Sequence, residues 1–186
     1  MTPIDFHMPV LQVVVPLLIA PLVVLLQPRG LAWAAAAAAS FASFAIAVSL
    51  AMGVLGGHVY HYELGGWEAP FGIALKVNAF NALMLLVLTG DSTAALLAGR
   101  QSVDRQIEVH RQPLFYSAWL LALAGMAGIL VSADAFNIFV FMEISSLASY
   151  VLVAGGPDRR ALPAVFKYLI MGTIGATVYL IGGGLI

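Results

Sequence analysis

The sequence is dominated by six long apolar segments that are separated by short polar or glycine-rich connections. A helix needs about 20 apolar residues to cross the roughly 30 Å hydrocarbon core of a bilayer. The six segments run over residues 8–26, 31–55, 74–98, 114–131, 135–154 and 161–186. The pattern therefore predicts an all-α integral membrane protein with about six transmembrane helices, folded as a single membrane domain over residues 1–186.

The basic residues are distributed unevenly among the connections, which predicts how the chain is oriented. The first, third and fifth connections contain Arg29, Arg100, Arg105, Arg111, Arg159 and Arg160. The second and fourth connections contain no Lys or Arg, although Lys76 lies close to the end of the second. Because cytoplasmic loops are enriched in Lys and Arg, we expect the odd-numbered connections in the cytoplasm and the N-terminus outside.

The second connection has a different pattern from the rest. Polar and apolar residues alternate loosely from His58 to Leu64, and Gly65 and Gly66 then interrupt the alternation. Alternation that ends at glycines is typical of a short β-hairpin. We expect such a hairpin over residues 58–71, lying on the outer surface.

The composition supports a membrane protein and excludes several classes of function. Of the 186 residues, 62% are hydrophobic and 9% are charged, whereas soluble domains carry about 25% charged residues. The net charge is near zero, so no basic surface is available to bind nucleic acid. The chain has no cysteine, and His58 and His61 lack a third metal ligand. We expect no metal, no cofactor and no enzymatic activity, and a multi-pass location in the cell (inner) membrane.

Three charged residues lie well inside the apolar segments, away from their ends: Asp91, Glu143 and Lys167. A charge inside the bilayer costs a few kcal/mol and usually serves a function. Glu143 lies roughly 13 Å from the outer end of its segment and so near the midplane. Ser146 and Tyr150 follow at i+3 and i+7 on the same face. A carboxylate beside hydroxyl groups suits a hydrated proton site; the alternative is a structural glutamate satisfied by a neighbouring helix.

Lys167 lies about six residues into the last segment, roughly 10 Å below the cytoplasmic surface. The short connection before it makes the fifth and sixth helices antiparallel neighbours. Counting from their shared end, Glu143 and Lys167 differ in depth by about 6 Å, which is within reach of a lysine side chain. The alternative is a lysine whose ammonium extends to the cytoplasmic interface.

Two aspartates have less specific surroundings. Asp91 lies in a polar notch between Gly90 and Ser92, which suits either a helix-packing hydrogen bond or a proton relay. Asp134 lies at a helix junction, three residues before Asn137. We expect Asp134 and Asn137 to be structural, with Asp134 capping the fifth helix.

Two stretches of the chain resemble a known family. They are DAFNIFVFMEISSLASY, from Asp134 to Tyr150, and RRALPAVFKYLIMGTIG, from Arg159 to Gly175. Both resemble the antiporter-like subunits of complex I and its relatives. The chain is most similar to the D-type subunit of the multisubunit Mrp-type cation/proton antiporters, and residues 65–72 and 111–116 share this similarity.

The resemblance implies a role for two of the buried ionisable residues. Glu143 matches the helix-five glutamate that the family uses in proton translocation, and Lys167 matches a basic position of helix six. Family members have about fourteen helices, which include two inverted repeats with broken helices. We therefore expect this chain to correspond to the N-terminal portion of such a subunit. The family often carries an acidic residue near position 78, where this chain has Asn78.

Together these observations predict a membrane subunit of a multisubunit Na+/proton antiporter. Its partners would be other membrane subunits and the lipid bilayer. Glu143 and Lys167 would translocate protons, with Asp91, Ser146 and Tyr150 as relay or support residues. Protonation of Glu143 would weaken its attraction for Lys167 and so bias the next site along the membrane. One alternative is a proton-pumping membrane-arm subunit of an NADH-quinone oxidoreductase or membrane-bound hydrogenase; another is a truncated packing subunit without transport of its own.

Overall fold

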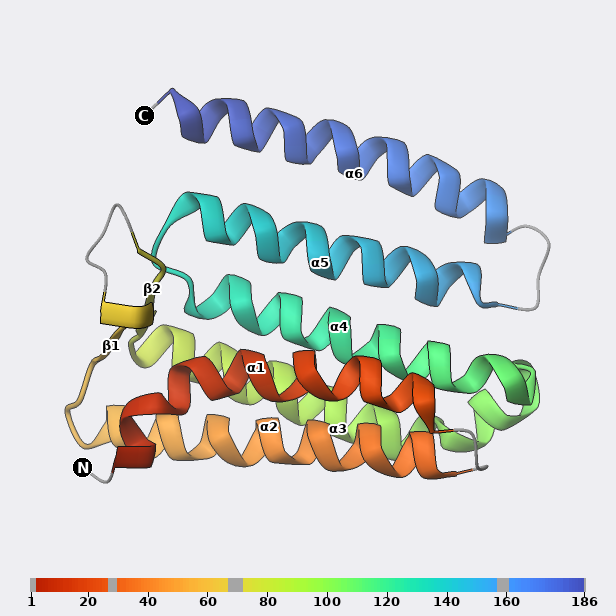
Figure 1. The fold of residues 1–186 in the computed structure, drawn as a ribbon, viewed down its shortest axis with the longest axis horizontal. Helices are drawn as coiled ribbons and strands as arrows, with labels where there is room; N and C mark the ends of the chain where they lie inside the picture. Colours follow the sequence, from red (N-terminus) through yellow and green to blue (C-terminus); the bar gives the residue numbers. More distant parts are fainter. Residues whose placement is uncertain (1–2, 27–29, 67–71, 157–160, 186) are drawn as a thin grey trace.

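The computed structural model describes residues 3–26, 30–66, 72–156 and 161–185, which form a bundle of long α-helices (Figure 1). In chain order the helices are α1 (Pro3–Leu25), α2 (Leu31–Leu55), α3 (Ala79–Gln106), α4 (Gln112–Val131), α5 (Ala135–Ala154) and α6 (Ala161–Gly184). Each runs antiparallel to the one before it, so successive connections alternate between the two ends of the bundle (Figure 1). All six are long and apolar enough to cross a membrane, which confirms the predicted fold class.

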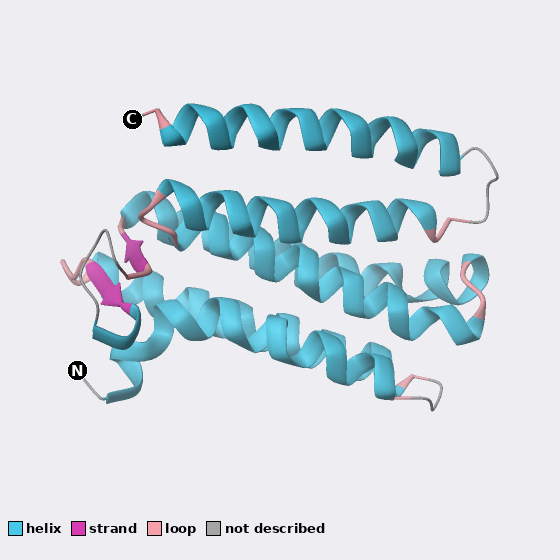
Figure 2. Cartoon of the chain, turned by 45° about the horizontal axis from the view of Figure 1, so that its top comes forward, coloured by secondary structure: helices cyan, strands magenta, loops and turns pink. Residues whose placement is uncertain are grey.

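The two ends of the bundle differ in structure. One end carries a small β-sheet (Figure 2) and is termed here the hairpin end. The other end contains the last turns of α3 and the connection to α4, and it is termed the basic end because of three arginines: Arg100, Arg105 and Arg111. The other arginines of the predicted cytoplasmic connections lie outside the described residues: Arg29, Arg159 and Arg160.

The third helix differs from its predicted bounds, because it begins at residue 79 instead of 74 and ends at 106 instead of 98. Its start is set by a capping box. The Asn78 side chain accepts a hydrogen bond from the Asn81 backbone N at 3.0 Å, and the Asn81 side chain accepts one from the Asn78 backbone N at 3.2 Å. These bonds satisfy backbone N–H groups that a helix N-terminus leaves free. At the other end, the helix continues for about two polar turns beyond its apolar part.

The residues before Asn78 form a strand instead of the first turn of a helix. β1 (Tyr60–Glu63) pairs antiparallel with β2 (Ala74–Val77), with Tyr60 opposite Val77 (Figure 2). The predicted hairpin over residues 58–71 therefore has its first strand in place, but its second strand lies beyond that range. Residues 67–71 lie outside the described part of the chain.

The centre of the bundle is α4, which packs against α1, α3 and α5. In its apolar span 61% of the residues are buried, against 11% in α5 and 6% in α6. Gly125 of α4 faces α5, where an added β-carbon would lie 2.6 Å from the backbone N of Ser145. The small residue lets the two backbones approach closely. This packing fixes α5 against the core, and α6 lies on the outside of α5 (Figure 1).

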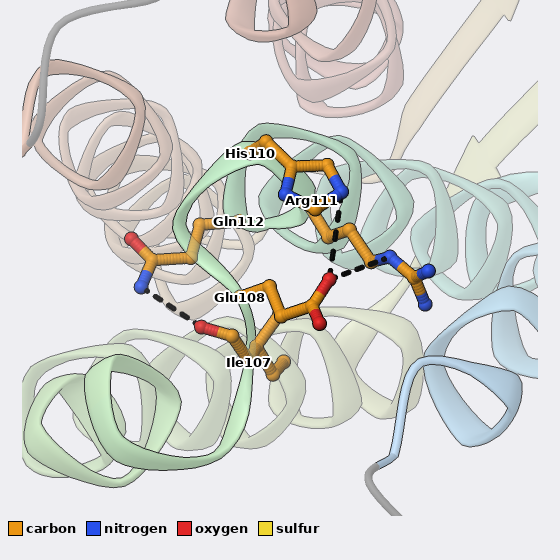
Figure 3. Close-up of polar contacts among 5 residues, drawn as sticks. All are labelled: Ile107, Glu108, His110, Arg111 and Gln112. Atoms are coloured by element: carbon orange, nitrogen blue, oxygen red, sulfur yellow. Dashed lines mark hydrogen bonds and ion pairs between the residues drawn. The ribbon is translucent and has the colours of Figure 1, made fainter.

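The connection at the basic end contains several polar contacts (Figure 3). A single 3-10 turn, η2 (Val109–Arg111), joins α3 to α4. Glu108 Oε2 lies 3.3 Å from Arg111 Nε and 3.5 Å from His110 Nε2. Gln112 Nε2 donates a hydrogen bond of 3.3 Å to the backbone carbonyl that follows α3. Because these side chains are exposed, each of the two contacts of Glu108 contributes less than about 1 kcal/mol to stability.

Candidate functional site

Glu143 lies near the middle of α5 and is half-buried. The first residue of α5 is set by its N-cap, Asp134, whose side chain accepts a hydrogen bond of 2.8 Å from the Asn137 backbone N. Ser146 is half-buried and Tyr150 is buried, and both share the helix face of Glu143 by their spacing. The described structure thus contains one face of α5 that combines a carboxylate with two hydroxyl groups.

Tyr150 shows where this face of α5 points. Its hydroxyl lies against Gly172 of α6, where an added β-carbon would overlap it. Its ring packs edge-on against the ring of Tyr168, also of α6, with centroids 5.0 Å apart. Glu143 lies two turns earlier on the same face, so it is directed towards the α5–α6 contact.

Lys167 of α6 is exposed, and it does not pair with Glu143. Both residues are described, and no ion pair within 4.0 Å joins them. The register of the helices explains this. Ala135 of α5 contacts Gly183 of α6, with 3.8 Å between the Ala135 β-carbon and one added at Gly183. In antiparallel helices Glu143 is therefore level with Gly175, eight residues or about 12 Å from Lys167 along the axis.

The direction of the two side chains increases their separation. Long side chains in a helix lean towards its N-terminus. For Lys167 this is the basic end of the bundle, and for Glu143 it is the hairpin end. The sequence predicted a depth difference of about 6 Å between Glu143 and Lys167, and the register of α5 and α6 makes it about 12 Å. The predicted direct contact between the two side chains does not form in this structure.

Asp91 lies on α3 at a cavity of about 210 Å3 between α3, α4 and α5. Ser92 and Ser149 also line this cavity. Ser92 Oγ accepts a hydrogen bond of 2.9 Å from Trp119 Nε1 of α4. The structure therefore brings Asp91 close to α5, although by a different face of α5 from the one that carries Glu143.

One buried polar residue, Gln12 of α1, has no counterpart among the sequence predictions. Gln12 is fully buried, and neither its Oε1 nor its Nε2 has a hydrogen-bond partner within the described residues. Ser40 and Ser43 of α2 are also buried, with hydroxyls that lack a partner in the same part of the chain. Buried amides normally form hydrogen bonds. The sequence signal for such a residue is a lone amide side chain within an apolar segment.

Comparisons with known proteins give individual relatives, although no family model matches the chain. The N-type subunit of the NADH-quinone oxidoreductase of Desulforudis audaxviator is 40% identical over 185 residues, covering 96% of this chain and 36% of that protein. The D-type subunit of the Na(+)/H(+) antiporter of Bacillus subtilis is 33% identical over 122 residues, covering 66% of this chain and 24% of that protein. The D-type subunit of a probable K(+)/H(+) antiporter of Rhizobium meliloti is 36% identical over 125 residues, covering 67% of this chain and 22% of that protein.

Two solved structures share the fold closely. The membrane-bound sulfane sulfur reductase, an archaeal respiratory membrane complex, contains a chain with a TM-score of 0.86 and 29% identity, which matches 94% of this chain and 36% of that one. The Mrp complex of Dietzia sp. DQ12-45-1b contains a chain with a TM-score of 0.84 and 26% identity, which matches 98% of this chain and 34% of that one.

The fold and these likenesses define a multi-pass membrane protein of the kind found in multisubunit membrane complexes. The chain is a homologue of the D-type antiporter subunits and of the N-type subunit of NADH-quinone oxidoreductase. It spans 36%, 24% and 22% of the three relatives described above.

Proposed function

We propose that this chain is a membrane subunit of a multisubunit Na+/proton antiporter in the cell (inner) membrane, and that it takes part in proton translocation at Glu143. Other membrane subunits would be its partners. The observation that carries the proposal is a half-buried carboxylate near the middle of a membrane-spanning helix, on a face shared with Ser146 and Tyr150. A charged carboxylate at this depth costs a few kcal/mol, and residues that carry such a cost usually serve a function.

Lys167 would act on Glu143 by long-range electrostatics instead of a direct contact. The axial offset of about 12 Å is a lower bound on their separation, so at an effective dielectric constant of 20 the two unit charges interact by at most about 1.4 kcal/mol. Protonation of Glu143 removes this attraction and leaves the ammonium free to respond to another site. A stronger coupling requires Lys167 to swing towards α5, and its exposed position leaves space for this movement.

The test replaces each group by a neutral residue of similar size in the assembled complex. Glu143→Gln should slow Na+-driven proton movement in vesicles by about 100-fold, the effect expected for loss of a positioned acid–base group. Lys167→Gln should slow it less, because its electrostatic contribution is smaller. The matched controls are Glu63→Gln and Lys76→Gln, which remove exposed charges of the same type at the hairpin end and should leave transport unchanged.

The possible outcomes separate the proposal from a packing role. Unchanged transport in Glu143→Gln, with the complex intact by size-exclusion chromatography, would contradict proton translocation at this residue. Unchanged transport in both Glu143→Gln and Lys167→Gln would favour a packing subunit that does not transport ions.

A second candidate function is proton pumping in a redox-driven complex. It is favoured by the 40% identity with the N-type subunit of an NADH-quinone oxidoreductase, which extends over 96% of this chain. The fold likeness to a chain of an archaeal respiratory complex agrees with it. Purification of the native complex distinguishes the two, because a redox complex contains iron–sulfur subunits with electron paramagnetic resonance signals and an antiporter does not.

A further inference from the structure

Two adjacent cavities of about 350 and 210 Å3 lie between α3, α4 and α5. The larger reaches the basic end, where Gln106 and Gly156 line it. The smaller lies farther from the basic end along α3, and Asp91 lines it. The two share three lining residues: Ala95, Trp119 and Leu152. At about 30 Å3 per molecule, they have room for at most roughly twelve and seven waters.

Asp91 is the one charged side chain among the described residues that line these cavities. It lies nine residues before Arg100, so it is about 13 Å deeper than the arginine along α3. Asp91 is exposed on the surface of the bundle, where contact with hydrocarbon would cost a few kcal/mol. Water in the adjoining cavity would hydrate the carboxylate and remove this cost.

The linings of the two cavities are mainly apolar, with a few polar side chains near Asp91 and at the basic end. Trp119 Nε1 donates a hydrogen bond of 2.9 Å to Ser92 Oγ, next to Asp91. On the opposite side Ser149 belongs to α5, six residues or about 9 Å along the helix from Glu143. The smaller cavity therefore connects Asp91 with the helix that carries the proposed translocation site.

We propose that the two cavities form one water-filled route from the basic end to Asp91, and that Asp91 takes up protons for transport. A hydronium ion transfers its proton to a carboxylate oxygen, an O–H bond forms, and a water molecule remains. Trp119 acts as a positioning residue that holds the wall between the cavities. The inference rests on the proposed function and adds to it a second proton-accepting group and the route that supplies it.

The hydration of the route can be measured directly, because the chain contains no cysteine. In the assembled complex, Ala95→Cys places a thiol in the shared wall, and Ala94→Cys places one on the outer face of the same helix at nearly the same depth. A charged methanethiosulfonate reagent reacts with thiolates in water. Added from the basic-end side, it should modify Ala95→Cys at least about tenfold faster than Ala94→Cys. Ser102→Cys, nearer the basic end, is the positive control.

Three results would overturn the route. They are equal rates at positions 94 and 95, modification at position 102 alone, and labelling of Ala95→Cys only by a lipid-soluble maleimide, which would indicate a dry groove. Labelling is independent of transport. A failure of the proposed function in Glu143→Gln is therefore distinguishable from a failure of this inference.

The uptake of protons at Asp91 is tested by a second measurement. Asp91→Asn should retain the labelling pattern and slow transport at least severalfold, and unchanged transport would overturn the role of the carboxylate. If Asp91→Asn does not assemble, Ala95→Phe provides the alternative, because its ring would fill the shared part of the two cavities. Transport at the normal rate in an assembled Ala95→Phe complex would also overturn the proposal.

Discussion

Among single residues, Asp134 affects the candidate site although it is not part of that site. Its backbone is extended, with φ −126° and ψ 149°, and its side chain accepts a hydrogen bond from the Asn137 backbone N. The Asn137 side chain donates to the same carboxylate. These contacts begin α5 at residue 135, and all later positions on that helix, Glu143 included, follow from this start.

Asp134→Ala should therefore destabilise the protein. Loss of an N-cap costs about 1 kcal/mol, which corresponds to a decrease in Tm of about 2–4 °C for a chain of this size. Thermal unfolding of the purified protein in detergent measures the change. Asp134→Asn is the matched control, because asparagine caps helices as well as aspartate does and should retain most of the stability. Equal Tm values for Asp134→Ala and the unchanged protein would show that the cap is not needed.

Residue patterns predicted some of these local features and missed others. Asp134 and Asn137 were identifiable because capping depends on neighbours along the chain. Gln12 is recognisable in the sequence as a lone amide in an apolar segment, but its complete burial without a partner among the described residues is not. Burial depends on which helices surround a residue, and the sequence around Gln12 does not specify that arrangement.

At the level of helices, the contact between α4 and α5 depends on Gly125, which leaves room for the opposite backbone. A β-carbon on Gly125 would lie 2.6 Å from the Ser145 backbone N and 2.8 Å from the Phe141 carbonyl oxygen. Backbone atoms cannot move aside as a flexible side chain can. An added methyl group would therefore push the two helices apart and shift Glu143 with α5.

Gly125→Ala should accordingly lower the free energy of unfolding by about 1–3 kcal/mol, the usual cost of overpacking. Gly99→Ala is the matched control, since apart from its chain neighbours and the adjacent backbone of α3, no described atom lies within 4 Å of an added β-carbon there. Within α3 this exchange should be neutral or stabilise by up to about 1 kcal/mol. Unfolding in detergent compares the two variants, and similar stabilities would contradict the role of Gly125 in close packing.

The bounds of the helices were predictable to different degrees. α2 and α5 begin and end at the residues that the apolar pattern indicated, because glycines or a capping aspartate border the apolar runs. The pattern could not separate β2 from α3, since residues 74–98 form one apolar run. The division at Asn78 depends on a local capping box, and the strand depends on pairing with β1, more than ten residues away.

For the whole molecule, the feature that the sequence predicted least well was the register between neighbouring helices. Glu143 and Lys167 were each recognisable from their depth in an apolar segment. Their distance was not, because it depends on how α6 slides along α5. Contacts such as Tyr150 with Gly172 and Ala135 with Gly183 set that register. The cavity at Asp91 likewise needs three helices in place before it exists.

The positive-inside rule predicts that the basic end of the bundle faces the cytoplasm and the hairpin end faces outside. This orientation can be tested by cysteine labelling. Val59 at the hairpin end and Val109 at the basic end are both valines, with 53% and 45% of their surfaces exposed. Each can be replaced by cysteine in a chain that has none. An impermeant maleimide added to intact cells should label Val59→Cys and leave Val109→Cys unlabelled. Inverted vesicles should give the reverse.

The same measurement decides the direction of proton uptake. If the basic end faces the cytoplasm, the cavities between α3, α4 and α5 open there, and Asp91 takes up cytoplasmic protons. Labelling of Val109→Cys in intact cells would place the N-terminus inside and contradict the predicted orientation. The route to Asp91 would then open to the exterior, so its protons would come from outside and its thiol-labelling experiment would succeed only from that side.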